Sequence, residues 1–448
     1  MPEEKTFRSG VVPGRWPLIG HAWPLFKAPF AFLASLPQHG DLVEMRLGPT
    51  PVHVPTHPEL LRRTLVDDRT FDKGGTYYDR AREMAGNGVA TCTHQDHRRQ
   101  RRLLQPAFAE PQLARYATVM EQQIAALTDS WGAERSFEAY PVLYGLALRI
   151  VTRTLFSTLV DEAVTDEIRH SFDVVFGNFF RQMFLPRAVN RLPLPGNRRH
   201  RAALALLRAA VERVIAESRK DEDDGNVLAA LLAAHEAEGA AVVDAELRDH
   251  VVTVLAAGSE TVASTLTWAL YLLSEHPEVQ HALQQEADAR LVGPLAVWDE
   301  VPELPLTHRV ITETIRLYPP GWLFTRVTAT ATELAGRRLA PGTTIVITPV
   351  PVHRNPAVFA RPDAFDPDRW LPARAAALPR GAFAGFGAGA RKCIGDAYGV
   401  GECALALASV ARRWTVATVP VPDVRPVPLA AFYRPRRLFL RVKRRSAS

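Results

Sequence analysis

The segment of residues 386–395 constrains this chain more than any other, because it places one cysteine in a glycine-rich loop just before a long Ala- and Leu-rich helical pattern. A helix N-terminus and nearby cations favour the thiolate form of a cysteine, and Arg391 and Lys392 directly precede Cys393. Glycines such as Gly387 let the backbone approach a flat ring closely and turn amide donors toward a sulfur. A lone cysteine is usually only a small apolar residue. This flanking pattern instead favours a thiolate that binds a metal held in a flat ring.

Every fixed position of the haem-binding signature of the cytochrome P-450 family, Phe-x-x-Gly-x-Arg-x-Cys-x-Gly, is present in this segment. The chain therefore resembles the haem-thiolate monooxygenases of that family. The resemblance implies haem b as the cofactor, with Cys393 as the axial ligand of its iron and with Phe386, Gly387 and Arg391 beside it. It also implies that the sulfur donates electron density that favours cleavage of the O–O bond, which is a known property of the family.

Two charged residues farther up the chain, Glu313 and Arg316, lie three apart on a helix that we expect between Pro305 and Pro319. An exposed pair at this spacing is usually a weak salt bridge, worth about 0 to 1 kcal/mol. The spacing is nevertheless similar to the family's Glu-x-x-Arg pair, and the segment FDPDRW, which contains Arg369, resembles the family's Phe-x-Pro-x-Arg segment. The resemblance implies that Glu313, Arg316 and Arg369 form a buried ion network that supports the haem loop without taking part in catalysis.

A long helix is predicted over residues 244–276, with a capping residue at its start and a proline after its end. Near its middle lies Gly258, although glycine costs about 1 kcal/mol relative to alanine in a helix interior. Activation of dioxygen gives a reason for a glycine beside polar residues, because it needs space and a proton path in a dry site. In the family the matching acid and alcohol deliver protons, so the resemblance assigns this role to Glu260 and Thr261. Thr261 would also bond a carbonyl one turn back and open the helix locally, whereas a dent filled only by packing is the alternative.

Haem carries two propionates, and a fold that buries it should supply cations for them. His97 and Arg101 lie four apart on a helix predicted before Pro106, and they resemble the family's Trp-x-x-x-Arg motif with histidine at its first position. The resemblance also assigns propionate binding to Arg326, and His353 is a further predicted donor. An arginine-rich run would otherwise indicate a solvated or nucleic-acid-binding surface. We expect no nucleic-acid partner for this chain.

The 448 residues contain no linker, repeat or low-complexity run, so we expect one domain over residues 1–448. The predicted fold class is mainly α with small peripheral β-sheets, with a β-rich part over about 1–60 and a helical body over about 61–448. The resemblance implies the triangular cytochrome P-450 fold, with haem between the long central helix and the helix after the cysteine loop. Strands are predicted at residues 42–47, 344–349, 414–419 and 438–442.

The three cysteines, Cys92, Cys393 and Cys403, form neither a Cys-x-x-Cys pair nor a zinc-ligand spacing, so we expect no disulfide. The chain shows no charged segment followed by an apolar stretch at its start, and no run of eighteen apolar residues. We therefore expect a cytoplasmic, monomeric enzyme without a membrane anchor, unlike the family's microsomal members.

The net charge of +6 and the isoelectric point of about 9.4 do not come from one long basic block. We expect an acidic ferredoxin to be steered by cations that the predicted fold gathers on the thiolate side of the haem, an effect that salt weakens. The chain has no phosphate-binding glycine motif, so electrons should come from ferredoxin and a ferredoxin reductase that uses NAD(P)H. The predicted cations are Arg98, Arg99, Arg102, Arg391 and Lys392.

Aromatic and apolar side chains are dense in the segments that line the substrate pocket in relatives. An aromatic stripe is often plain core, but together these residues suggest an apolar substrate. Residues 98–108, 256–270 and 317–326 are similar to bacterial oxygenases of cyclic terpene hydrocarbons. The resemblance implies that dioxygen and two electrons hydroxylate an unactivated C–H bond of a cyclic sesquiterpene, with further oxidation in some relatives; a fatty acid, steroid or macrolide is the alternative substrate. The predicted pocket residues are Tyr77, Tyr78, Phe176, Phe179, Phe180, Ala257, Trp322, Leu323, Phe324 and Phe432.

Two other functions stay open at this point. One is a haem-thiolate peroxygenase or isomerase fed by a peroxide, although such relatives usually lack the acid and alcohol pair. The other is a non-catalytic haem sensor or carrier, which has no need of a proton path. Turnover with ferredoxin, its reductase and NADPH, compared with turnover on peroxide alone, discriminates between these functions.

Overall fold

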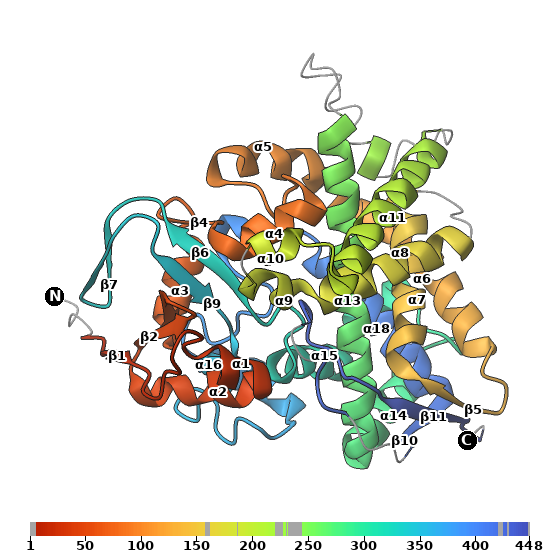
Figure 1. The fold of residues 1–448 in the computed structure, drawn as a ribbon. Helices are drawn as coiled ribbons and strands as arrows, with labels where there is room; N and C mark the ends of the chain where they lie inside the picture. Colours follow the sequence, from red (N-terminus) through yellow and green to blue (C-terminus); the bar gives the residue numbers. More distant parts are fainter. Residues whose placement is uncertain are drawn as a thin grey trace.

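One helix, α13 (Asp244–Glu275), runs through the centre of the molecule in this computed structural model (Figure 1). Its bounds confirm the predicted central helix to within one residue at its end. With 32 residues it spans roughly 48 Å at 1.5 Å per residue. It packs against α7 (Ala139–Leu155), α18 (Asp396–Arg413) and α15 (Pro305–Leu317). The structure describes residues 6–156, 162–185, 187–219, 227–229, 231, 244–419, 424–427 and 430–446.

Further helices surround this centre, and most of them have an apolar side that is buried against it. The longer ones are α3 (Pro58–Val66), α4 (Gly75–Ala85), α5 (His94–Leu104), α6 (Glu110–Asp129), α8 (Glu162–Gly177), α11 (Pro195–Ser218) and α14 (Pro277–Arg290). The short α-helices are α1 (Ala22–Lys27), α2 (Pro29–Ser35), α9 (Phe179–Phe184), α10 (Arg187–Arg191), α16 (Val350–His353) and α17 (Pro372–Ala376). The 3-10 helices are η1 (Leu36–His39), η2 (Gln105–Phe108), η3 (Trp298–Glu303), η4 (Pro367–Trp370) and η5 (Gly389–Arg391).

A six-stranded sheet lies at one edge of the helical body, with the strand order β1-β2-β3-β9-β6-β4 (Figure 1). Its β1–β2 and β3–β9 pairs are parallel, and its other pairs are antiparallel. Two of its strands come from beyond residue 320, so the sheet is not confined to the predicted N-terminal part. The strands are β1 (Ser9–Val11), β2 (Leu42–Leu47), β3 (Thr50–Pro55), β4 (Phe71–Asp72), β6 (Phe324–Thr328) and β9 (Thr344–Ile347).

The predicted strands at 42–47 and 344–349 correspond to β2 and β9, but the sequence did not indicate β3 or β6. Two prolines in β3, Pro51 and Pro55, hide that strand because proline normally argues against a strand interior. The pairing of β6 with β9 sets Arg326 opposite Ile345, which buries the arginine in the sheet. This register decides the position of a predicted site residue.

Two smaller sheets complete the fold. The three-stranded sheet has the order β10-β11-β5, in which β10 and β11 are the predicted strands near the C-terminus. No helix among the described residues is long and apolar enough to cross a membrane. The strands of these sheets are β5 (Glu134–Glu138), β10 (Trp414–Thr418), β11 (Phe439–Arg444), β7 (Thr332–Leu334) and β8 (Arg337–Leu339).

Candidate active site

Cys393 lies in the loop between η5 and α18, as predicted, and its side chain is accessible. The Cys393 backbone N–H donates to the Phe386 carbonyl at 2.9 Å, which closes the loop. Gly389 has a φ of +68°, and a Cβ at this position would lie 2.7 Å from the Val66 Cα. Glycine is therefore needed here both for its backbone conformation and for the close packing of the loop on the end of α3.

The surroundings of the sulfur favour the protonated thiol. Although the side chain is accessible, the protein packed around it desolvates the thiol, and this is the largest effect that raises the pKa of Cys393 above its ordinary value. The Gly395 N–H, Arg101 and Lys392 act in the opposite direction. Of the two cations predicted to favour the thiolate, Lys392 acts on the pKa of Cys393 and Arg391 is not among its causes, and the pKa stays raised. A metal ion that binds the sulfur removes its proton.

One face of α13 is open where its neighbours are buried. Ala257 is exposed and Thr261 is half-exposed, and residues four apart share a helix face. The Thr261 hydroxyl donates to the Ala257 carbonyl at 2.6 Å, as the sequence predicts. The helix nevertheless continues without interruption through this point, so the expected local opening is absent.

Gly258 has a different role from the one that we expected. A Cβ at this position would lie 2.7 Å from Cγ2 of Val151 on α7. The glycine therefore allows the close approach of α13 and α7, which is a packing requirement and not a need for space around dioxygen.

Glu260 is buried and is directed toward α7. The Tyr140 hydroxyl donates a hydrogen bond to its Oε2 atom. Burial raises the pKa of Glu260 to about 7, while Arg434 and the Tyr140 hydrogen bond lower it. Arg434 in turn forms a salt bridge with Asp173 of α8 at 2.8 Å. The carboxyl group can therefore exchange a proton near neutral pH.

A group of cations lies at the junction of β6, α5 and the cysteine loop. Burial is the largest cause that lowers the pKa values of Lys73, His97 and Arg326. The positive charge of Arg391 lowers them further. Burial and the nearby cations lower the pKa of His97 to about 3. Arg101 donates to the carbonyls of Ala390 at 3.2 Å and Lys392 at 2.5 Å, and so ties α5 to the cysteine loop.

Arg326 is the member of this group that most clearly requires an anion. It is 1% exposed, and its Nε and Nη1 atoms have no hydrogen-bond partner among the described residues. A buried and unpaired guanidinium is costly, so the position suits a ligand that carries carboxylates. Lys73, whose Nζ donates to the Ala90 carbonyl at 2.7 Å, is a site residue that sequence reasoning missed, because no local pattern marks a single lysine.

Arg391 itself already has protein partners. Its Nε donates to Asp68 at 2.9 Å, its Nη2 to Asp72 at 3.2 Å and its Nη1 to the Cys92 carbonyl at 3.0 Å. Its side chain is 2% exposed. This burial removes Arg391 from the predicted surface patch for ferredoxin and makes it a tie between the cysteine loop and the segment around α4.

His353 does not take the predicted role of a propionate donor. Its Nδ1 lies 3.1 Å from the Arg316 carbonyl, and its Nε2 accepts from the Ala384 N–H at 3.1 Å. Its pKa is about 3, chiefly because it is buried. Both ring nitrogens therefore join α15 to the chain before the cysteine loop.

Glu313, Arg316 and Arg369 come together in the buried network that the resemblance implies. Arg316 donates to both Glu313 oxygens at 2.7 Å, and Arg369 donates to Oε1 at 3.1 Å. Trp370 adds a further donor at 2.9 Å. Arg316 also donates to the carbonyl of His353 at 2.8 Å, so the network is connected to the residue that contacts the cysteine loop.

Half of the ten predicted pocket residues form one aromatic cluster: Tyr77, Tyr78, Phe179, Phe180 and Trp322. Phe180 lies at the centre, with ring centroids 5.2 Å from Trp322 and 6.2 Å from Tyr77. Phe176 and Phe432 make a separate edge contact at 4.9 Å. Two contacts extend the cluster: Tyr77 to Phe179 at 4.9 Å and the Trp322 N–H to the Ala430 carbonyl at 3.3 Å.

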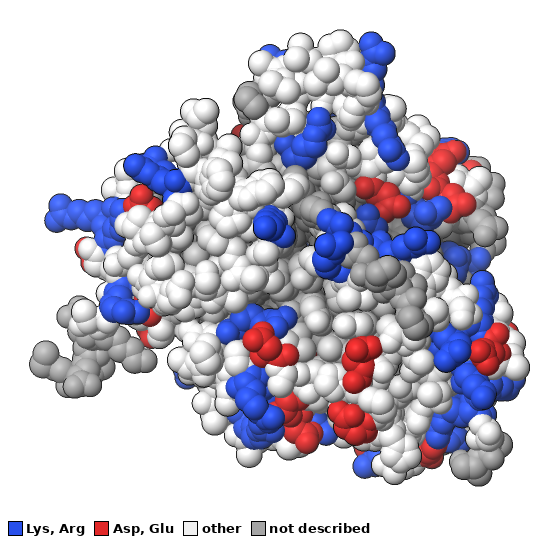
Figure 2. Space-filling view, turned by 60° about the horizontal axis from the view of Figure 1, so that its bottom comes forward, with Lys and Arg blue, Asp and Glu red and all other residues white. Residues whose placement is uncertain are grey.

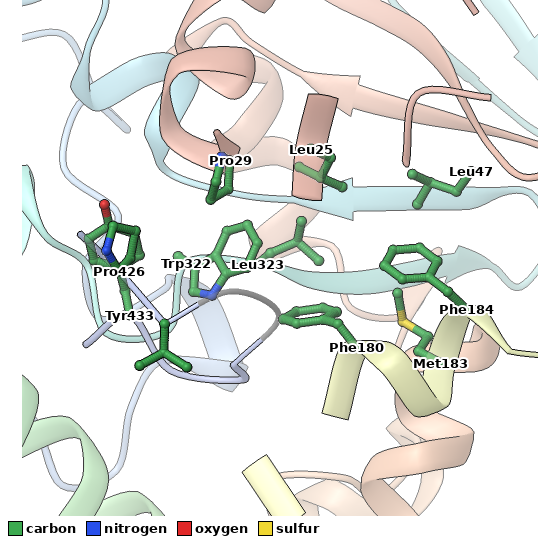
Figure 3. Close-up of a pocket in the computed structure, with 11 residues that line it drawn as sticks. Leu25, Pro29, Leu47, Phe180, Met183, Phe184, Trp322, Leu323, Pro426 and Tyr433 are labelled. Atoms are coloured by element: carbon green, nitrogen blue, oxygen red, sulfur yellow. The ribbon is translucent and has the colours of Figure 1, made fainter. Parts of the chain in front are cut away.

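An apolar pocket adjoins this cluster and opens to solvent; its empty space, with the open solvent counted, is about 440 Å³ (Figure 3). Phe180 and Phe184 of α9 lie across from Leu25 and Pro29, and Leu323 is also in its lining.

Tyr78 joins the aromatic cluster to the cation group. Its ring centroid lies 5.2 Å from that of Tyr77, and the ring lies 5.8 Å from both Lys73 Nζ and the Arg82 guanidinium. Phe324 packs in the small apolar cluster of the six-stranded sheet, because β6 turns it away from the aromatic cluster.

The fold and site define the class of protein. The family model described as Cytochrome P450 matches residues 11–439, and the chain belongs to this family. It is therefore a haem-dependent monooxygenase, whose iron is bound by a cysteine thiolate. The accessible thiol of Cys393 and the unpaired guanidinium of Arg326 fit this cofactor.

Three relatives are similar over almost the whole chain. Pentalenene oxygenase of Streptomyces avermitilis is 50% identical, with 99% of each chain covered. Cyclooctatin synthase of Streptomyces melanosporofaciens is 46% identical, with 95% of this chain and 94% of the relative covered. Cyclooctat-9-en-7-ol 5-monooxygenase of the same organism is 44% identical, with 94% and 92% covered.

Proposed function

We propose that this monooxygenase hydroxylates an unactivated C–H bond of a cyclic terpene hydrocarbon, with a sesquiterpene of the pentalenene type as the first candidate. The observation that carries the proposal is the 50% identity with pentalenene oxygenase over 99% of both chains. The apolar lining of the pocket beside Phe180 and Trp322 supports it, because a hydrocarbon offers no group for polar side chains to bind.

In this proposal the chain holds haem through Cys393, with Arg326, Lys73 and Arg101 as cations near the propionates. Haem bound in this way supplies the activation of dioxygen, with two electrons from outside. Glu260 carries a proton from the side of α7, and its pKa of about 7 allows it to be protonated and deprotonated at neutral pH. Thr261 holds its hydroxyl on the open face of α13. His97, which is buried beside the same cations, contacts a propionate through its ring.

Electrons come from a separate ferredoxin with its reductase, and the enzyme works in the cytoplasm. The surface that we propose for ferredoxin consists of Arg98, Arg102 and Lys392, which are exposed, whereas Arg391 is buried and Arg99 forms a salt bridge with Glu246. Reduction rates should fall as ionic strength rises, because salt screens the attraction between exposed charges.

The deciding experiment is a titration of the haem-loaded enzyme with cyclic sesquiterpene hydrocarbons, followed by turnover with ferredoxin, reductase and NADPH. A shift of the iron spin state on binding and a hydroxylated product support the proposal. A spin-state response to fatty acids, steroids or macrolides, with none to terpenes, overturns the substrate class but leaves the monooxygenase.

A terpene alcohol is the second candidate substrate, because one relative is named for oxidising cyclooctat-9-en-7-ol. The same titration should therefore include each hydrocarbon and its alcohol. Tighter binding of the alcohol would indicate that this enzyme oxidises a terpene that another enzyme has already hydroxylated. Turnover on peroxide that equals turnover with ferredoxin would favour a peroxygenase instead.

A further inference from the structure

Large apolar side chains are exposed mainly in two segments of the chain. Of the twelve such residues among the described part of the chain, eight lie in residues 8–40 or 174–211. Single exposed apolar residues are normal, but a concentration of this kind marks an interaction surface. We call these eight residues the mouth surface: Val11, Trp16, Leu18, Ile19, Trp23, Phe26, Leu192 and Leu194.

The most exposed member of the mouth surface is held out on a tight turn. Trp16 and Gly20 bond each other through both backbone N–H groups at 2.9 Å, and Gly20 pairs with Leu47 of β2. Leu18 at the tip has a φ of +64° and is 91% exposed. A leucine in this left-handed conformation is strained, and here it gains no burial in return. The fold therefore presents an apolar tip to its surroundings.

Both segments border the same apolar pocket. Leu25 and Pro29 line it from the first segment, and Phe180 and Phe184 line it from the second (Figure 3). The loop that carries Leu192 and Leu194 returns to α9, because the Asn190 side chain donates to the Gln182 carbonyl at 2.8 Å. The two segments that carry the mouth surface thus both line this pocket, although the eight exposed residues themselves are not part of its lining.

The charge of the two segments is one-sided. Residues 8–40 and 174–211 contain ten of the 54 basic residues and none of the 48 acidic ones, so that the rest of the chain has 44 basic and 48 acidic residues. The two segments are therefore basic, as is the stretch of residues 424–448, which has eight basic and no acidic residues. Arg15, Lys27 and Arg191 are exposed and form no salt bridge with any described carboxylate. In Figure 2 the acidic side chains lie mainly in the lower and right-hand parts of the face.

We propose that the mouth surface docks reversibly on a lipid bilayer that contains anionic lipids. Exposed Trp, Leu and Phe side chains insert at the boundary between head groups and acyl chains, and nearby Lys and Arg bind the head groups. An acidic partner protein would explain the exposed cations. It would not explain the strained Leu18 tip, because an apolar side chain gains nothing from contact with carboxylates. The attachment is peripheral, since no described helix is suited to span a membrane. A hydrocarbon substrate, if the function proposed above is right, would dissolve in the same bilayer.

The test is co-sedimentation of the haem-loaded full chain, without substrate, with phosphatidylcholine vesicles and with vesicles in which part of the lipid is phosphatidylglycerol. We expect binding that rises with the phosphatidylglycerol fraction and falls with salt. Leu18→Asn should weaken it about tenfold or more, because a leucine side chain no longer enters the bilayer. Asparagine tolerates the left-handed backbone, so this variant keeps the fold.

The matched control is Val292→Asn, since Val292 is 94% exposed outside both segments. For the charges, Arg15→Gln with Arg191→Gln should weaken binding roughly tenfold, whereas Arg338→Gln with Arg380→Gln, two exposed arginines outside both segments, should not. The carbon monoxide spectrum and the melting temperature verify that each variant is folded. No binding to vesicles of either kind, or equal binding by the Leu18 and Val292 variants, overturns the proposal. Because no substrate is present, failure of the terpene assignment cannot produce either result.

Discussion

The hydroxyl of Tyr140 on α7 donates a hydrogen bond to the buried carboxylate of Glu260 on α13. A donor of this kind stabilises the charged form, so it lowers the pKa that burial raises. The Arg434 cation acts in the same direction, and its salt bridge to Asp173 fixes it in place. The proton affinity of the predicted acid is thus set from α7, α8 and the C-terminal segment.

Replacing this donor should move the pH dependence of turnover. If Glu260 delivers protons in its acid form, product formation falls as pH rises through its pKa of about 7. Tyr140→Phe removes a stabilising bond to the carboxylate and raises the pKa, so the falling limb should shift by about one pH unit to higher pH. The measurement is product yield per NADPH between pH 6 and pH 9. Tyr398→Phe, which removes a buried hydroxyl bonded to Thr154, should leave the limb unchanged.

Stability should respond to the same group. The folded pKa of Glu260 is about 7 and its ordinary value is 4.5, so the folded state holds the proton more tightly than the unfolded chain. The contribution of Glu260 to the free energy of unfolding is therefore fully present below the unfolded-state pKa of 4.5. It is lost as pH rises through the folded-state pKa of about 7. Glu260→Gln cannot ionise and should therefore be more stable than the original chain by about 3 kcal/mol at pH 8. Unfolding at pH 4.5 and pH 8 measures the difference, which should nearly vanish at the lower pH.

Loss of the Thr261 hydroxyl should uncouple electron use from product formation. Thr261→Ala is expected to consume NADPH while releasing peroxide, because the proton path on the open face of α13 is broken. Thr265→Ala is the matched control, since its hydroxyl bonds the Thr261 carbonyl at 2.8 Å in the same way but is buried. Peroxide and product per NADPH are the measured quantities. Equal coupling in the two variants contradicts the role of Thr261.

Cys393→Ser should abolish the red-shifted Soret band of the reduced carbon monoxide complex, because an alcohol does not replace a thiolate as iron ligand. Cys92→Ser should retain the band, although Cys92 is also near the cations of the site. A band that persists in Cys393→Ser would refute the assigned ligand.

Arg326→Met should separate cofactor binding from protein stability. Its guanidinium is buried with two unpaired nitrogens, so its removal should cost the haem-free protein little stability or increase it. With haem present, a charged hydrogen bond to a propionate is lost, and haem should dissociate roughly tenfold faster. Transfer of haem to apomyoglobin measures this rate. An unchanged rate would show that Arg326 does not bind the cofactor.

The sequence alone determined the features that depend on residues close together in the chain. The cysteine loop, the spacing of Glu313 and Arg316 and the course of α13 follow from turn chemistry and helical periodicity. These local patterns also carried the family resemblance, which the match over residues 11–439 confirmed.

Only the tertiary structure decided which partners the side chains meet. Glu260 and Tyr140 are 120 residues apart, and Arg391 and Asp68 are 323 apart, so no local pattern connects them. His353 is not available to bind a propionate, because two distant backbone groups already bond both of its ring nitrogens. Burial and the direction of a side chain are properties of packed elements, and they set the charge and availability of each group.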